Sequence, residues 1–311
     1  MGTTTCTSAA VWDMQAERWR KSLKAQGLSD NTLRGYLYTA QRWRKWLETE
    51  GYNIEPDDVE SFHIDEFIVD IIDKSSPANA AHHYRNLRVY ITWLKKRKQI
   101  TGGNPFDETE APKVPDKLTP LLSDEDHAAI LLACRGTDLQ ALRNMAIVLL
   151  FIDTGMRVSE LHSLLAEDID FKTKRLLVRG KGKKLRWVQF GASTGLALAK
   201  YLKARAKHPL ADFNPALWLS RRTDKPLSIN GIKRMLNRLG QRSGLVDSLH
   251  AHRFRHDFSH RWQDAGGSEA GLMAIAGWDS ERMPRHYGKI AANHRALAEH
   301  ERLSLADRLV S

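Results

Sequence analysis

Residues 154–161 read Thr-Gly-Met-Arg-Val-Ser-Glu-Leu and follow a mostly apolar stretch, Leu139–Thr154. The apolar stretch predicts a buried helix, and Gly155 is suited to end it because glycine tolerates left-handed backbone angles. Arg157 therefore stands directly after the end of a buried helix. Glu160, one turn further on, is placed to orient the Arg157 guanidinium through a bidentate pair.

Three short β-type segments come next, at Ile169–Phe171, Arg175–Val178 and Leu185–Phe190. The turn Gly-Lys-Gly-Lys-Lys at 180–184 joins the last two, so we expect a hairpin that projects several ammonium groups. Taken alone, such a turn is better explained as a solvated loop.

Helical periodicity dominates the first hundred residues. Apolar residues recur at helical spacing over 12–23, 33–47, 62–72 and 84–94, and Ser76 before a proline is typical of a helix start. Three or four such helices make a small all-α domain. The same periodicity returns after the hairpin, so the fold class is mainly α with a small antiparallel β-sheet.

The length of 311 residues favours two domains. Residues 104–120 carry four prolines and no periodicity, which is typical of an extended linker. We therefore expect a helical domain over 1–103, a linker over 104–120 and a mixed α+β domain over 121–311.

The charge distribution points to nucleic acid. The chain has 48 Lys and Arg against 37 Asp and Glu, a net charge of +11, and Phe171–Arg242 holds 19 basic residues against two acidic ones. Neutralisation of phosphates supplies most non-specific nucleic-acid affinity. Two cysteines exclude a disulfide framework, and the longest apolar run, Met145–Ile152, is too short for a membrane-spanning helix. We also expect no secretory signal.

A basic cluster lies in the last third, at His252-Arg253-Phe254-Arg255-His256. Positions 252, 255 and 256 share one helix face. Two histidines four residues apart resemble half a metal site, which His260 would extend, but the intervening arginines repel a cation. The cluster is better suited to a phosphate, because arginine supplies a planar fork of donors and histidine an adjustable proton.

Tyr287 lies in a further basic segment, 32 residues after Arg255. A lone tyrosine usually packs as an amphipathic side chain. A phenol has a pKa near 10, so it needs a base or cationic neighbours to act as a nucleophile at neutral pH.

Taken in order, these residues resemble the tyrosine site-specific recombinases, also called the phage integrase family, and its Xer- and Cre-like members in particular. The motif consists of Arg157, Lys181, His252, Arg255, Trp278 and Tyr287. The resemblance implies a helical SAM-like core-binding domain followed by a catalytic tyrosine-recombinase domain.

The resemblance also implies residue roles. Arg157 and Arg255 would hold the scissile phosphate, Lys181 would protonate the departing 5′-oxygen, and His252 would assist proton movement. Tyr287 would attack and form a 3′-phosphotyrosyl link. The choice of Lys181 over the other hairpin lysines rests on spacing alone.

Further residues take supporting roles by the same resemblance. Trp278 stands where the family usually has a histidine, and an indole donates a hydrogen bond but does not titrate. We therefore expect Trp278 to hold the phosphate or to pack against Tyr287, and not to carry protons. Glu160 and His256 would hold the catalytic side chains in position. DNA contacts are expected from the hairpin, at Lys183, Lys184 and Arg186.

The implied partner is a double-stranded recombination site held by four copies of the chain, in the bacterial cytoplasm at the nucleoid. A C-terminal helix within residues 290–310 would dock on a neighbouring copy, although packing in cis fits equally well. No cofactor is expected, neither metal nor ATP, and no arm-binding domain. Two alternatives remain, a type IB topoisomerase-like enzyme and a non-catalytic DNA-binding regulator.

Overall fold

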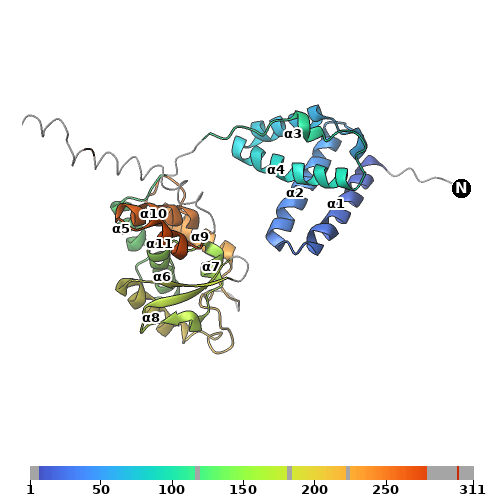
Figure 1. Ribbon diagram of the computed structural model, residues 1–311. Coiled ribbons are helices and arrows are strands. Elements are labelled where there is room, and N and C mark those ends of the chain that lie inside the picture. Colours follow the sequence, from blue (N-terminus) through green and yellow to red (C-terminus); the bar gives the residue numbers. More distant parts are fainter. Residues whose placement is uncertain (1–6, 116–119, 181–183, 222–224, 279–299, 301–311) are drawn as a thin grey trace, which may run out of the picture. The chain divides into compact units, whose positions relative to one another are not determined.

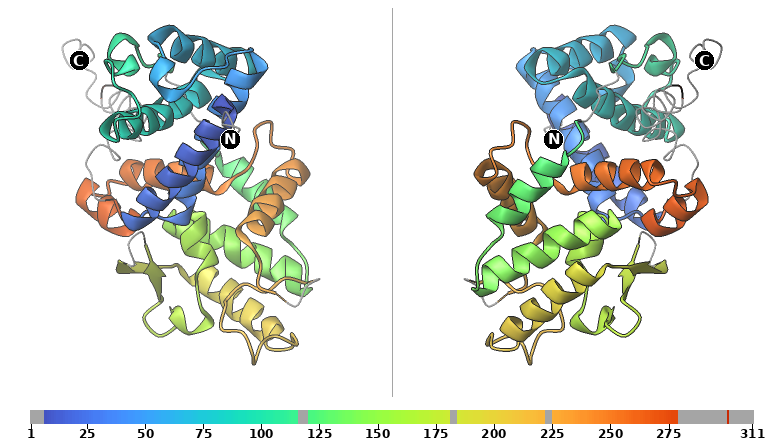
Figure 2. Two further views of the ribbon diagram at one scale, coloured as in Figure 1. Left: turned by 90° about the vertical axis from the view of Figure 1, so that its right-hand side faces the viewer. Right: turned by 90° about the vertical axis from the view of Figure 1, so that its left-hand side faces the viewer.

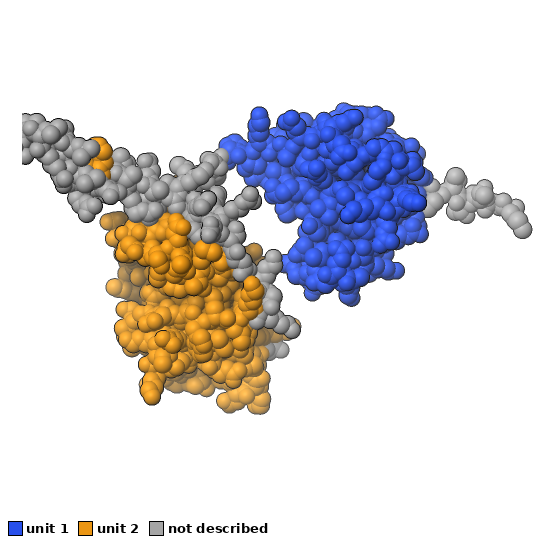
Figure 3. Space-filling view, in the orientation of Figure 1, with its two compact units in different colours: residues 1–117 blue, residues 118–311 orange. Residues whose placement is uncertain are grey.

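The computed structural model divides the chain into two compact units, Met1–Lys117 and Leu118–Ser311 (Figure 3). It describes residues 7–115, 120–180, 184–221, 225–278 and 300. Each unit has its own apolar core.

The first unit is all-helical (Figure 1), as its apolar periodicity predicts. Its described residues form four α-helices, which are α1 (Ser8–Ala25), α2 (Asp30–Thr49), α3 (Ser61–Lys74) and α4 (Pro77–Lys96). Ser29 and Ser76 cap α2 and α4 by accepting hydrogen bonds from backbone N–H groups in the first turn. The core is rich in aromatic side chains, among them the fully buried Trp19 and Trp43.

Part of the segment expected as linker is folded onto this unit. Pro105–Glu108 form a short 3-10 helix, and the Phe106 side chain is 1% exposed within the aromatic core. The Tyr84 hydroxyl lies 3.0 Å from the carbonyl oxygen of Thr109. The packed part of the first unit therefore extends past residue 103, because one buried phenylalanine ties down a stretch that lacks periodicity.

The second unit combines seven described α-helices with one small sheet (Figure 1). The helices are α5 (Asp124–Ala133), α6 (Leu139–Thr154), α7 (Val158–His162), α8 (Ala192–Arg205), α9 (Ile229–Arg242), α10 (Ala251–Asp264) and α11 (Glu269–Ala276). Helix α6 is central, and both α8 and α10 pack against it (Figure 2).

The sheet is antiparallel, in the order β1 (Ile169–Asp170), β2 (Arg175–Arg179), β3 (Leu185–Gln189). The hairpin β2–β3 pairs Leu176 with Val188 and Val178 with Arg186. Strand β3 packs against α6 and α11.

The predicted fold class, mainly α with a small antiparallel sheet, is confirmed. Within the described residues, no helix combines the length and hydrophobicity that crossing a bilayer requires.

Candidate active site

The end of α6 is fixed by Gly155. Its φ of 53° lies in the left-handed region, and a Cβ at this position would lie 2.5 Å from the Cδ1 of Phe258 in α10. Both constraints require glycine. The close approach brings the end of α6 against α10, and Arg157 follows two residues later, immediately before α7.

Glu160 holds Arg157 as the sequence predicts. Its carboxylate accepts from the Arg157 backbone N–H at 2.9 Å and from Arg157 Nη1 at 2.8 Å. The pair uses one guanidinium nitrogen and the backbone instead of two guanidinium nitrogens. Arg157 keeps 37% of its side chain exposed, whereas Glu160 is buried at 3%.

The Arg186 side chain points in a different direction from the one that the sequence predicts. The sequence predicts it among the DNA contacts of the hairpin, but only 14% of its side chain is exposed and it points into the unit. Its Nη1 and Nη2 donate to the two oxygens of Glu160 at 3.0 and 2.8 Å, and its Nε donates to the carbonyl oxygen of Ile275 at 2.8 Å. Arg186 therefore joins the hairpin to Glu160 and to α11.

The Glu160 carboxylate is held ionised by this arrangement. Burial alone would raise the pKa of Glu160, but the Arg186 guanidinium, the backbone N–H of Arg157 and the Arg157 guanidinium together lower it below its ordinary value. One carboxylate is thus shared between two guanidinium groups, which leaves the cluster net positive.

Arg255 reaches the same place from α10. It is 4% exposed, and its Nη1 and Nη2 donate to the carbonyl oxygens of Gly155 at 3.0 Å and Ala276 at 2.8 Å. Arg157 Nη2 donates to the carbonyl oxygen of Gly277 at 3.1 Å. Three arginines therefore meet at the C-terminal end of α11, where the helix dipole favours cations.

Trp278 directly follows this helix end. Its side chain is 6% exposed and packs with Phe258 and Leu272, and the Arg255 Cζ lies 4.9 Å from the centre of its ring. This distance is within the range of a cation–π contact. The structure therefore places Trp278 against the Arg255 guanidinium.

The histidines of α10 lie on the same helix as Arg255. His252 is exposed in the first turn and His256 is buried one turn later. His260 lies 2.8 Å from Asp264 through its Nδ1. Over the described ranges, no three His, Cys, Asp or Glu side chains gather as a metal site.

The remaining predicted site residues are on or beside the hairpin and near the C-terminus. Lys184 is exposed immediately before β3. Lys181, Lys183 and Tyr287 lie outside the described residues. Of the predicted set, the structure thus brings together Arg157, Glu160, Arg255 and Trp278, and it places Arg186, predicted as a DNA contact, on Glu160.

Comparison with known proteins decides the family. The profile of the phage integrase family matches residues 121–294, more than half of the chain. The chain belongs to the phage integrase family. The profile of the phage integrase N-terminal SAM-like domain matches residues 16–101, which agrees with the predicted class of the first domain.

Relatives and solved structures agree with this family. The chain is 28% identical over 285 residues to tyrosine recombinase XerC of Ralstonia pickettii, covering 86% of this chain and 87% of that protein. It is 30% identical over 224 residues to XerC 1 of Ralstonia nicotianae, covering 67% and 68%.

Two solved structures share the fold. A lambda integrase dimer bound to a COC′ core site matches with a TM-score of 0.71 at 20% identity, covering 88% of this chain and 76% of that one. The Tn1549 transposon integrase bound to transposon right end DNA matches with a TM-score of 0.71 at 22% identity, covering 96% and 99%. The predicted resemblance is confirmed: the chain is a tyrosine recombinase, an enzyme class that cleaves and rejoins DNA at specific sites.

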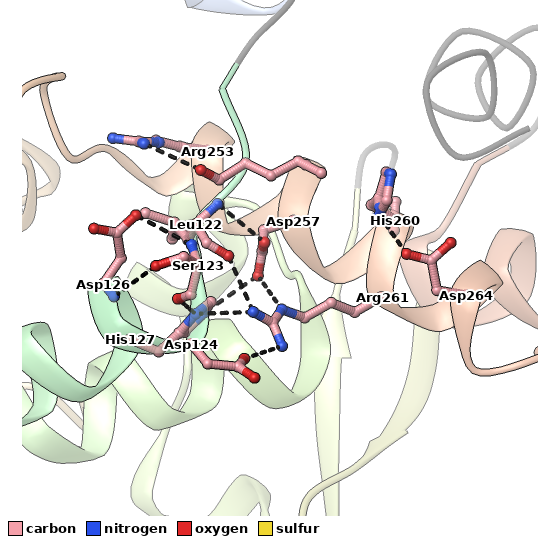
Figure 4. Close-up of polar contacts among 12 residues, drawn as sticks. Leu122, Ser123, Asp124, Asp126, His127, Arg253, Asp257, His260, Arg261 and Asp264 are labelled. Carbon is pink, nitrogen blue, oxygen red and sulfur yellow. Dashed lines mark hydrogen bonds and ion pairs between the residues drawn. The ribbon is translucent and has the colours of Figure 1, made fainter. Parts of the chain in front are cut away.

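The opposite face of α10 carries a polar cluster that the sequence reasoning missed (Figure 4). Asp257 accepts from the backbone N–H of Leu122 at 3.3 Å and from Arg261 Nε at 3.1 Å, and Arg261 Nη1 pairs with Asp124 at 2.8 Å. Arg253 Nε donates to the carbonyl oxygen of Pro120 at 3.1 Å. This face of the recombinase's α10 therefore holds the start of the second unit.

His127 makes this cluster pH-dependent. Its Nε2 lies 3.1 Å from Asp257 Oδ2 and its Nδ1 lies 2.9 Å from the carbonyl oxygen of Ser123. Burial disfavours the charged imidazole and Arg261 repels it, but Asp257 and Ser123 outweigh both and raise the pKa of His127. Because the pKa of His127 is higher in the folded state, protonation of His127 stabilises the fold at pH values below its unfolded-state pKa of about 6.5. This added stability is lost as the pH rises through the folded-state pKa.

We therefore expect His127→Gln to lower the melting temperature more at pH 5.5 than at pH 8.5. Differential scanning fluorimetry of the parent and the variant at the two pH values measures the gap between their melting temperatures. Adding Asp257→Asn to both proteins should reduce or reverse the pH dependence of the gap, because burial and Arg261 then oppose the charged imidazole and only Ser123 still favours it. An equal gap at both pH values would contradict the assignment.

Arg186 provides a second test within the site. We expect Arg186→Met to lower the melting temperature, because a buried carboxylate and a carbonyl lose their donors at a cost of about 1–3 kcal/mol. Strand cleavage should slow by about 10- to 100-fold, since Glu160 loses the contacts that fix it and so holds Arg157 less rigidly. The salt dependence of DNA binding should stay unchanged.

Lys184→Met is the matched control, because Lys184 is exposed on the same hairpin. As a phosphate contact it would lower the slope of log affinity against log salt by about 0.9 without changing the melting temperature. If Arg186→Met also lowers the salt slope without changing the melting temperature, Arg186 contacts DNA, and its assignment as a support of Glu160 is wrong. Arg186→Lys should recover part of the cleavage rate, because it keeps the charge.

Proposed function

We propose that this recombinase breaks and rejoins DNA at a specific site through Tyr287, with the phosphate held by Arg157 and Arg255. The observation that carries the proposal is the meeting of these two guanidinium groups. Arg157 Nη1 and Arg255 Nη2 both donate to the carbonyl oxygen of Ala276, at 3.5 and 2.8 Å. They come from segments about one hundred residues apart in the chain, and fixed donors of this kind stabilise developing negative charge.

The chemistry is a balanced phosphoryl transfer. The Tyr287 oxygen attacks the phosphorus as the phenol passes its proton to the His252 imidazole, and the bond from phosphorus to the 5′-oxygen breaks. Lys181 gives the departing oxygen its proton, which an arginine is too basic to do. Attack on the phosphotyrosyl link by the 5′-hydroxyl of another strand reverses these steps, so no ATP is consumed.

Other residues of the site hold the reacting groups. His252 assists proton movement at the phosphate, and Glu160 and His256 support the arginines. Trp278 is 6% exposed against Arg255, which suits a side chain that fixes the guanidinium and carries no proton. Lys183 and Lys184 contact DNA from the hairpin, whereas the buried ion pair of Arg186 supports a positioning role.

The assembly we propose is a homotetramer on two DNA sites, in the bacterial cytoplasm at the nucleoid. This proposal is supported by the complexes that the structural neighbours form with DNA. They include a lambda integrase tetramer bound to a Holliday junction and XerH bound to difH substrate. A C-terminal segment within residues 290–310 would link neighbouring copies.

The testing experiment is capture of the covalent intermediate. A duplex selected from a random pool for binding to the protein is nicked beside the cleaved bond, so that the released fragment diffuses away. We expect a protein–DNA adduct in the presence of EDTA, and peptide mass spectrometry should place the nucleotide on Tyr287. Absence of any adduct would favour a DNA-binding regulator, and relaxation of supercoiled DNA without site preference would favour a type IB topoisomerase-like enzyme.

A further inference from the structure

Helix α10 presents two sets of side chains on nearly opposite faces. Arg255 reaches the ends of α6 and α11, whereas Arg253 and Asp257 are each turned by about 160° from Arg255 at 3.6 residues per turn. Arg261 continues the row of Arg253 and Asp257 at the same interval of four residues. We call these three residues the rear face of α10. One side of the helix therefore belongs to the candidate active site, and the rear face lies away from it.

Arg253 binds the chain where it enters the second unit. Its Nε and Nη2 donate to the carbonyl oxygens of Pro120 and Leu121 at 3.1 and 3.3 Å, and its Nη1 donates to the carbonyl oxygen of Asp247 at 3.3 Å. The residue is 5% exposed, so these contacts are made in the interior. A buried guanidinium that loses such acceptors is costly, which makes this attachment firm.

Asp257 and Arg261 hold the next residue (Figure 4). Asp257 accepts from the backbone N–H of Leu122 at 3.3 Å, and Arg261 Nη2 donates to the carbonyl oxygen of Leu122 at 3.0 Å. Over the described ranges, residues 120–122 make no hydrogen bond from backbone to backbone. The polar groups of this segment therefore depend on the rear face of α10.

The same connection is anchored at its other end in the first unit. Phe106 is buried in the aromatic core there, and the Tyr84 hydroxyl donates to the carbonyl oxygen of Thr109 at 3.0 Å. Residues 110–119 join Thr109 to Pro120, a connection that spans about 40 Å at most when fully extended. A displacement of the first unit that uses up this length acts directly on the rear face of α10.

Helix α10 is packed too closely to absorb such a displacement locally. A Cβ at Gly155 would lie 2.5 Å from the Phe258 ring, and Asp257 is only about 3 Å from Arg255 along the helix axis. Close-packed interiors transmit strain. A misplacement of about 1 Å in a reacting group can slow a reaction by about 100-fold.

We propose that Arg253, Asp257 and Arg261 are positioning residues, which connect Arg255 to the chain that enters from the first unit, so that strand cleavage depends on how this connection is held. The inference rests on the proposed function for the role of Arg255. None of the three residues touches the phosphate in this scheme. When the first unit is fixed on DNA, the connection fixes the rear face, and Arg255 keeps the geometry that cleavage requires.

Two buried arginines provide a matched test. Arg205 in α8 is 6% exposed and, like Arg253, donates to loop carbonyl oxygens, among them those of Asn214 and Ala216. Arg253→Met and Arg205→Met should both lower the melting temperature. Only Arg253→Met should slow single-turnover cleavage at saturating protein, by about 10- to 100-fold, with the affinity for the duplex unchanged.

Conservative and exposed variants complete this comparison. Arg253→Lys should recover part of the rate, because it keeps a donor on the rear face. If Arg253→Met does not fold, Arg261→Gln replaces it, since the Arg261 side chain is 44% exposed, and a smaller decrease in rate is expected. Equal cleavage rates for the rear-face variant and Arg205→Met would overturn the proposal.

A longer connection tests the path itself. Insertion of Gly-Ser-Gly-Ser after Lys113 leaves the rear face intact and gives the chain slack. It should slow cleavage by the parent by about 10-fold and cleavage by the rear-face variant by a smaller factor, because both changes interrupt one path. An insertion that does not slow the parent, or that slows both proteins equally, would also overturn the proposal.

Hydrogen exchange of the full-length Tyr287→Phe protein tests the inference without strand cleavage. Binding of the selected duplex should slow exchange of the backbone amides of α10, and the insertion after Lys113 should reduce this protection. Failure to find an adduct on Tyr287 would refute the proposed function and leave this comparison intact. Protection that is unchanged by the insertion would refute the inference and leave the adduct experiment intact.

Discussion

Tyr287→Phe is expected to abolish the covalent protein–DNA adduct, because phenylalanine keeps the ring and removes the oxygen that attacks phosphorus. Adduct formation on the nicked duplex, followed by denaturing gel electrophoresis in the presence of EDTA, measures the effect. We expect no adduct above background, while retention of the intact duplex in a gel-shift assay shows that the protein still binds DNA.

Tyr38→Phe is the matched control, since Tyr38 is 60% exposed in the first unit and its replacement also removes one phenol. This variant should form the adduct at the parent rate. An adduct that survives in Tyr287→Phe would assign the nucleophile to another residue. An adduct that appears only after addition of a divalent metal ion would contradict the proposed chemistry.

The second large effect is expected at Arg255. Arg255→Ala should slow cleavage by about 10²- to 10³-fold, the reduction typical of removing one fixed donor to developing negative charge. Trp278→Phe should slow it by less, about 10-fold, because phenylalanine keeps an aromatic face for the guanidinium and lacks only the indole N–H. Single-turnover rates on the nicked duplex give both values.

Stability has to be measured beside these rates, because Arg255 also donates to the carbonyl oxygens of Gly155 and Ala276. Arg255→Lys keeps the charge and should fall between the two variants. If Trp278→Phe is slower than Arg255→Ala at equal melting temperature, the assignment of Trp278 as a supporting side chain is wrong.

Much of the fold follows from local sequence signals. Ser76 caps α4 as its place before a proline predicts, and Gly155 ends α6 in the left-handed conformation. Such signals act within a few residues, so they are readable from the chain alone. The pairing of Arg157 with Glu160 can be predicted for the same reason, because both residues lie in one short segment.

Long-range contacts are harder to predict, and Arg186 illustrates why. Its neighbours Leu185 and Trp187 are apolar but exposed at 61% and 55%, whereas Arg186 shares its face of the strand with the buried Val188. The alternation with Val188 is a signal present in the sequence. Its interpretation requires knowing that Glu160, 26 residues earlier, lies beneath the strand and supplies a charge partner.

The other missed cluster has the same origin. Arg253, Asp257 and Arg261 recur every four residues along α10, a spacing that puts them on one face. The sequence draws attention to His252 and Arg255 on this helix instead, and nothing nearby in the chain indicates that residues 120–124 cover the opposite face.

The sharing of Glu160 also bears on attempts to retarget the enzyme by exchanging parts with relatives. Arg157 and Arg186 sit on different segments yet depend on one acidic side chain, so replacing the hairpin alone would leave a foreign strand facing a carboxylate selected for arginine. Substitutions at the three positions should be non-additive. Chimeras that transplant 157, 160 and 186 as a set should retain turnover where grafts of the hairpin by itself do not.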